Sequence, residues 1–301
     1  MATGILNAAG NSKKPLVYLA IASFTNIILD LLFIKIFKLG VMGAAIATDI
    51  SQAISCILAI GYLLKVKSDY KLYIKDLKIN KETAVKIIKI GLPTAIQNMV
   101  ISFSNVLVQS SVNAYGATAM AGYAAYLKID GFNILPVLSI SMAVTTFTGQ
   151  NVGANRLDRV KKGMYSSLIM VFVYTVFIGA VLLIFSHQVL GLFTHSAHVI
   201  TYGQLVMKYF CPYYFLLGIL NVLAGTVRGA GKGIPPMIIL LFSMCIFRIL
   251  WIKIALPFYS SIDGVFILYP ISWLVGAILM ILYTKFGKWL PHKQMEKKEY
   301  S

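Results

Sequence analysis

Three polar side chains in apolar surroundings are the first candidates for chemistry in this sequence. Asn26 and Asp30 are four residues apart, so a helix places them on the same side. Thr48 stands seven residues into the next apolar segment (41–64), and Asp30 stands seven residues before the end of its own (15–37). Both therefore lie roughly 10 Å from the same end of a helix pair. Their carboxylate, amide and hydroxyl oxygens suit a small cation or a proton.

Asp30 allows a second interpretation. An ionisable side chain inside a membrane costs ~2.5–3.5 kcal/mol at mid-depth, so it indicates function by default. However, Asp30 is near the end of its segment, where its carboxylate could instead extend to the outer interface beside Lys35. Asp49 adjoins Thr48 but points about 100° away from it on a helix, so we rank it lower.

A polar stripe runs along the third apolar segment. The spacing of its residues, four, three and four, places them on one face of a helix, and the residues are Asn98, Ser102, Asn105 and Gln109. Such a face either lines a water-filled cavity or forms hydrogen bonds with neighbouring helices. We favour the cavity.

Four further charges fall inside apolar segments. Lys128 and Asp130 are two residues apart and do not face each other, so each needs a partner on another helix. The two residues either place charge in a cavity, where they take part in proton coupling, or form structural ion pairs with residues on other helices. Lys208 and Arg248 have no carboxylate at helical spacing, so we expect them to balance charge or to extend toward an interface.

The elements that position these residues must be membrane-spanning helices. The chain has 301 residues, of which 58% are hydrophobic and 12% charged, whereas soluble domains are about half apolar and a quarter charged. Crossing a bilayer takes roughly 20 apolar residues. Eight segments are long enough: 15–37, 41–64, 86–112, 118–148, 164–186, 199–224, 235–256 and 264–286. We therefore expect an all-α membrane protein, a polytopic bundle of about eight transmembrane helices.

The distribution of basic residues predicts the orientation in the cell membrane. The formal net charge is +17, but the charges cluster between apolar segments, which excludes a nucleic-acid-binding surface. Of the 27 Lys and Arg residues, 21 fall on one side if eight helices alternate. Since cytoplasmic loops carry the excess of Lys and Arg, both termini should be cytoplasmic. The three cysteines lie in apolar runs without metal or disulfide spacing, and no arrangement of catalytic residues stands out.

The chain also contains an internal repeat. Residues 4–64 align with residues 225–285 without a gap. The glycines and prolines that coincide carry the most weight because they fix backbone geometry, and the pairs are Gly4 with Gly225, Gly10 with Gly231, Pro15 with Pro236 and Gly43 with Gly264. Repeats of this kind are common in transporters, and the offset here spans six helices.

Several motifs, taken in order, resemble the multidrug and toxic compound extrusion (MATE) family, in particular its bacterial MepA-like exporters. The matching stretches are Gly4–Pro15, Asn26–Asp30, Leu39–Thr48, Gly91–Pro93, Lys128–Asp130, Gly149–Ala154 and Arg228–Gly231. The family is built from two six-helix lobes, so the resemblance implies that the first four helices are missing here. It divides the chain into the last two helices of the N-terminal lobe (1–64), a basic cytoplasmic linker (65–89), a six-helix C-terminal lobe (90–290) and a cytoplasmic tail (291–301).

The resemblance implies export of small organic cations by alternating access, coupled to H⁺ or Na⁺, with no other cofactor. Asn26, Asp30 and Thr48 match family positions proposed to form the cation or proton site of the first lobe. A further carboxylate of that site comes from the family's first helix. In some branches a glutamate of the third segment holds sodium in the second lobe. Ile101 occupies that position, which puts such a sodium site in doubt.

Two other functions stay open. The chain could be a truncated remnant, or a fragment of such a transporter, that inserts into the membrane without transporting. It could also be a flippase for lipid-linked oligosaccharides, because related export folds share its topology. If the chain is complete, a half-lobe would need the missing four-helix segment or another subunit as a partner.

Overall fold

The computed structural model describes residues 2–68, 70–76 and 78–290, and in this part of the chain every regular element is helical. Among these described residues, eight helical stretches are long and apolar enough to cross a membrane: Lys13–Ile36, Gly40–Lys65, Lys81–Asn113, Ala117–Gly153, Leu157–Ile184, Ala197–Gly229, Ile234–Phe258 and Asp263–Phe286. Each contains most or all of one segment expected from the sequence. The predicted all-α membrane fold is therefore confirmed.

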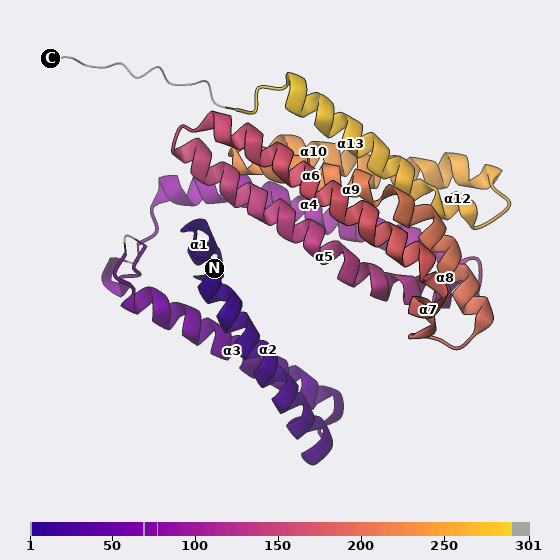
Figure 1. The fold of residues 1–301 in the computed structure, drawn as a ribbon, viewed down its shortest axis with the longest axis horizontal. Helices are drawn as coiled ribbons and strands as arrows, with labels where there is room; N and C mark the ends of the chain where they lie inside the picture. Colours follow the sequence, from indigo (N-terminus) through magenta and orange to yellow (C-terminus); the bar gives the residue numbers. More distant parts are fainter. Residues whose placement is uncertain (1, 69, 77, 291–301) are drawn as a thin grey trace. The chain divides into compact units, whose positions relative to one another are not determined.

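The described chain divides into two compact units, residues 1–80 and 81–301 (Figure 1). The first unit is a short helix, α1 (Ala2–Ala8), followed by α2 (Lys13–Leu31), the π-helical turn η1 (Leu32–Ile36), α3 (Gly40–Lys65) and the 3-10 turn η2 (Ile74–Asp76). Small side chains allow α2 and α3 to approach closely, and Ala22, Gly43 and Ala47 are buried between them. This contact fixes the register of the two helices and hence of the polar residues on them.

The second unit contains the remaining helices. They are α4 (Lys81–Asn113), α5 (Ala117–Gly153), α6 (Leu157–Ile184), α7 (Ser186–Gly191), α8 (Ala197–Phe210), η3 (Cys211–Tyr213), α9 (Tyr214–Gly229), α10 (Ile234–Leu241), η4 (Phe242–Ile246), α11 (Phe247–Leu250), η5 (Trp251–Ala255), η6 (Leu256–Phe258), α12 (Asp263–Phe266) and α13 (Leu268–Phe286). The long helices lie side by side, with α5, α6 and α9 in contact with one another (Figure 1).

Aromatic side chains fill the core of the second unit at its centre. Phe210 packs on Tyr269 with ring centroids 4.4 Å apart, on Tyr126 at 5.1 Å and on Trp273 at 5.4 Å. These four rings come from α5, α8 and α13, and all are at most 6% exposed. The core therefore ties three helices that are far apart in the sequence to one another.

The sixth span is interrupted where α8 gives way to α9. Pro212 lies in the 3-10 turn η3, because proline has no backbone N–H to continue the α-helical hydrogen bonding. Pro136 lies inside α5, which continues through it. Residues around the break are packed, since Cys211 and Tyr214 are both 2% exposed. The break thus directs the first residue of α9 into the core.

The turns of the internal repeat have the same backbone conformation. Gly10 has φ +81° and Gly231 has φ +84°, in the left-handed region that favours glycine. The backbone N–H after each glycine reaches back to a carbonyl five residues earlier, from Asn11 to Leu6 and from Lys232 to Val227. A second pair also matches, because Ser51 and Ser272 each donate a 2.8 Å hydrogen bond to the carbonyl three residues before. The sequence repeat is therefore a structural repeat.

Two expected boundaries can be compared with the elements. α4 begins at Lys81, inside the segment 65–89 that the sequence assigns to a linker. The expected tail, residues 291–301, lies outside the described residues.

Candidate functional site

Asn26 and Thr48 meet across the α2–α3 pair. The Asn26 side-chain amide donates a hydrogen bond of 3.5 Å to the Thr48 hydroxyl, which itself donates to the backbone carbonyl of Ala44 at 2.9 Å. The structure thus places an amide and a hydroxyl side by side, whereas the sequence spacing put Asp30 at the depth of Thr48. Asp30 lies one turn beyond Asn26 on α2.

Asp30 has a buried oxygen with no hydrogen-bond partner among the described residues. The atom is Oδ1, and the side chain as a whole is half-buried. A buried carboxylate oxygen without a donor is costly, so such an atom calls for a ligand, a proton or a donor from elsewhere. Asp49, by contrast, is exposed on α3. Of the two carboxylates in this region, Asp30 is the one that has a buried oxygen without a hydrogen-bond donor among the described residues.

The helix carrying Asp30 changes geometry directly after it. Residues Leu32–Ile36 form the π-helical turn η1, in which Phe37 N–H bonds the carbonyl of Leu32. Single π-helical turns in α-helices are frequent at functional sites because they displace neighbouring side chains from the regular helical register. The oxygens of Asp30, Asn26 and Thr48 fit a proton or a small hard cation. Their role in coupling stays a prediction.

The polar stripe of α4 lies largely at the surface of the second unit, although Asn105 also accepts a 2.9 Å hydrogen bond from the buried Arg248. Asn98, Ser102 and Asn105 are exposed and Gln109 is half-buried, whereas Ser104, Val108 and Val112 on the other side of the helix are buried. Gln109 also donates a 3.0 Å hydrogen bond to Asn113 on its own helix. An exposed polar face on a membrane-spanning helix is unfavourable against lipid, so this face requires water or further protein.

Asp130 is held by two tyrosine hydroxyls inside the second unit. Tyr214 donates to its Oδ1 at 2.7 Å from α9, and Tyr126 donates to the same atom at 3.1 Å from one turn earlier on α5. The two hydroxyls also contact each other at 2.5 Å. The sequence predicted a partner for Asp130 on another helix. That partner is the hydroxyl of Tyr214 on α9 rather than a cation.

Lys128 lies apart from this network. It is exposed, and its ammonium group stands 5.6 Å from the centroid of the Phe193 ring, a cation–π contact. No ion pair joins Lys128 and Asp130 within the described residues, in keeping with the expectation that the two side chains do not face each other.

Arg248 is fully enclosed, contrary to the expectation that it extends toward an interface. It is 2% exposed, and its guanidinium donates to Asn105 Oδ1 at 2.9 Å and to Ser272 Oγ at 3.2 Å. The ring of Tyr269 lies 4.3 Å away. Arginine carries donors in several directions, which lets one side chain join α4, α11 and α13. Lys208, on α8, is exposed as expected.

Comparison with known proteins decides the family. The chain matches the sequence model of the MatE family over residues 93–252, more than half of its length. The chain belongs to the MatE family. This MatE protein is 30% identical over 297 residues to the probable multidrug resistance protein YoeA of Bacillus subtilis, covering 94% of this chain and 63% of that protein. It is 30% identical over 210 residues to the multidrug export protein MepA of Staphylococcus aureus, covering 69% of this chain and 46% of MepA.

Solved MATE structures share the fold. An outward-facing multidrug resistance MATE family transporter has a TM-score of 0.88 at 22% identity, covering 94% of this chain and 64% of the other. The Vibrio cholerae MATE transporter VcmN has a TM-score of 0.85 at 23% identity with the same coverage. The resemblance found in the sequence is thus confirmed. The MatE chain described here spans 63% to 65% of the length of the first curated relatives it matches.

Sequence reasoning missed Tyr126 and the contact between Arg248 and Asn105 in the second unit. Tyr126 could have been found, because it precedes Asp130 by one helical turn. The contact of Arg248 with Asn105 joins residues 143 positions apart, and no local pattern in the sequence indicates it.

Proposed function

We propose that this MatE chain acts in cation-coupled export of small organic cations across the cell membrane. The observation that carries the proposal is the buried, unpartnered Oδ1 of Asp30, one turn from the Asn26–Thr48 hydrogen bond. Membership of the family and the printed names of its relatives, multidrug resistance and multidrug export proteins, support the substrate class. The coupling ion is H⁺ or Na⁺.

In this mechanism Asp30 is the group that binds the coupling ion. A proton or Na⁺ at Oδ1 neutralises the carboxylate, with the Asn26 amide carbonyl and the Thr48 hydroxyl as neighbouring oxygen ligands. Because a bound ion and a bound drug then favour different states of an alternating-access cycle, each weakens the binding of the other. The exposed amides of the α4 stripe provide the wet, uncharged wall along which an organic cation can move.

The orientation follows from charge. The linker 65–89 and the turn 156–162 are rich in Lys and Arg, and the positive-inside rule assigns them to the cytoplasm. Both termini are then cytoplasmic, and η1, at the other end of the first span, is at the outer side. Ions that enter from outside therefore reach Asp30. An exporter that takes up its coupling ion from outside needs this access.

The test is gradient-driven transport by the full chain in proteoliposomes. Ethidium movement is followed by fluorescence after an inward gradient of H⁺ or of Na⁺ is imposed, for the wild type, Asp30→Asn and Asp49→Asn. Asp49 is the matched control, an exposed aspartate on the neighbouring helix. We expect one gradient to drive transport in the wild type and Asp49→Asn, and no driven transport in Asp30→Asn.

Two results would contradict the proposal. The first is a wild-type chain that inserts as a folded, monodisperse protein and moves no ethidium under either gradient, which would favour a non-transporting remnant. The second is Asp30→Asn with wild-type coupling, which would remove Asp30 from the mechanism.

A further inference from the structure

A groove outside the polar sites runs between α6, α9 and α13 of the second unit. It has a volume of about 570 Å³, comparable to the pockets that hold small ligands in other proteins. Its apolar lining includes Leu168 and Phe172 on α6, Leu223 on α9 and Ile281 on α13. All three helices belong to stretches long and apolar enough to span a membrane, so the groove lies at the depth of the bilayer.

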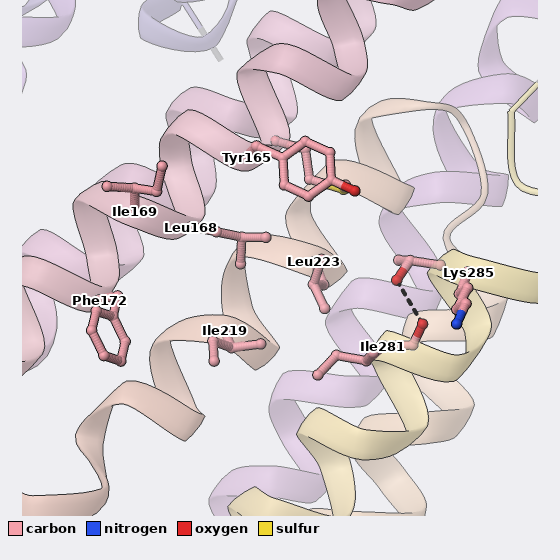
Figure 2. Close-up of a pocket in the computed structure, with 10 residues that line it drawn as sticks. Tyr165, Leu168, Ile169, Phe172, Ile219, Leu223, Ile281 and Lys285 are labelled. Carbon is pink, nitrogen blue, oxygen red and sulfur yellow. Dashed lines mark hydrogen bonds between the residues drawn. The ribbon is translucent and has the colours of Figure 1, made fainter.

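The polar groups of the groove are confined to one end. Figure 2 shows Tyr165 and Lys285 toward one end of the groove, on opposite sides of Leu223 in this view, while Phe172 and Ile219 lie toward the other end. Phe172 follows Tyr165 by seven residues, about 10 Å along a helix, which gives an apolar trough within one leaflet. A long apolar trough with a polar, basic end has the polarity of one phospholipid acyl chain and its headgroup.

The apolar wall needs an occupant. Tyr165 is 61% exposed, Ile169 65% and Ile281 44%, although all three line the groove. An apolar chain that packs along this lining adds dispersion contacts over its whole length, and these contacts restore what an exposed apolar surface lacks. Inside a bilayer, the molecules available to restore those contacts are acyl chains.

Charge selects the headgroup. Lys285 has only a ring contact, with Phe286 at 5.2 Å, and forms no ion pair within the described residues. Lys285 is the charged residue among those that line the groove, and no acidic residue of the described chain lines it. The end of the groove at Lys285 is therefore electropositive, and basic pockets between transmembrane helices bind anionic lipid headgroups.

The end of α13 holds Lys285 in place. Trp289 is 4% exposed, and its indole N–H donates a 2.8 Å hydrogen bond to the carbonyl of Thr284. Gly287 N–H bonds the carbonyl of Tyr283 at 2.7 Å and completes the last turn. The chain after α13 thus folds back on the helix end, so the lysine is presented from an ordered turn.

We propose that this groove binds an anionic phospholipid, with one acyl chain in the trough and the headgroup phosphate at Lys285 and the Tyr165 hydroxyl. The orientation proposed above puts the headgroup in the cytoplasmic leaflet. The lipid site requires only that the chain inserts into a membrane. A chain without transport activity would therefore leave this proposal intact, and a chain without lipid binding would leave the proposed function intact.

The test is native mass spectrometry of the purified full chain with equal amounts of phosphatidylglycerol and phosphatidylcholine that carry the same acyl chains. We expect the wild type to retain phosphatidylglycerol about fivefold in preference, because Lys285 attracts a headgroup of net negative charge and the choline ammonium of phosphatidylcholine offsets that attraction. Lys285→Gln should lose this preference. The matched control is Lys253→Gln, which removes an exposed lysine of η5 and should leave the preference unchanged.

A second variant tests the trough without touching the charge. Ile169→Trp fills the groove from an exposed position, so it should lower the retention of both lipids while the chain stays folded. Equal retention of the two lipids by the wild type, an unchanged preference in Lys285→Gln, or unchanged retention in Ile169→Trp would each overturn the proposal.

Discussion

The hydroxyl of Tyr214, the first residue of α9, donates a 2.7 Å hydrogen bond to the carboxylate of Asp130 on α5. The contact bridges the break at Pro212, because the 3-10 turn η3 immediately precedes Tyr214. One hydrogen bond thus links the carboxylate of the fourth span to the point where the sixth span changes direction.

Removing this hydroxyl should destabilise the second unit. Hydrogen bonds to charged groups contribute about 1.5–3 kcal/mol, and Tyr126 remains as a longer donor at 3.1 Å, so we expect Tyr214→Phe to cost about 1.5 kcal/mol. The measurement is the melting temperature in detergent. Tyr213→Phe is the control, since Tyr213 is 43% exposed. Equal melting temperatures for Tyr214→Phe and the wild type would show that the bond is not needed.

Gly122 should be intolerant of any side chain. A Cβ at this position would lie 2.6 Å from Tyr202 Cβ and 2.8 Å from the Val199 carbonyl, so α5 and α8 would have to separate. Gly131 is the control on the same helix, because a Cβ there meets nothing within 4 Å.

We expect Gly122→Ala to lower the melting temperature or the yield of folded protein, since overpacking a tight contact costs about 1–3 kcal/mol. Gly131→Ala should be neutral or stabilising, because alanine favours a helix over glycine by about 1 kcal/mol. A neutral Gly122→Ala would contradict the close packing of α5 on α8.

Gly231 should be sensitive for a different reason, its backbone conformation. Nothing within 4 Å would obstruct a Cβ, but φ is +84°, which costs an L-residue about 1–2 kcal/mol. Gly231→Ala should therefore lower the melting temperature, and Gly153→Ala, equally open but without positive φ, should not. If both variants melt alike, the left-handed turn of the repeat is not maintained in solution.

The spans and the repeat could be predicted because both depend on local sequence. Apolar length sets each helix, and the aligned Gly10 and Gly231 specify the same left-handed turn in both copies. Helical spacing likewise put Asn26 and Asp30 on one side of α2. The hydrogen bond of Asn26 to Thr48 was not predicted, because the sequence spacing gave only the depth of Thr48 in its helix.

The contacts of the second unit could not be predicted in the same way. Arg248 lacks a nearby acid in the sequence, which suggested an interfacial position, but Asn105 and Ser272 from distant helices solvate it in the core. Asp130 was expected to have a partner, yet only tertiary packing brings Tyr214 to it. Partners separated by many residues depend on how helices pack, and that information is not local.

We propose that Asp30 binds the coupling ion, and a measurement of ion-dependent drug binding tests this proposal. The dissociation constant of ethidium would be measured by fluorescence on the purified full chain over a range of pH and of Na⁺ concentration. We expect the constant to rise with one of the two ions by about 5–150-fold, the usual range of coupling between sites. The rise should persist in Asp49→Asn and vanish in Asp30→Asn. An ion dependence in Asp30→Asn equal to that of the wild type would contradict the claim.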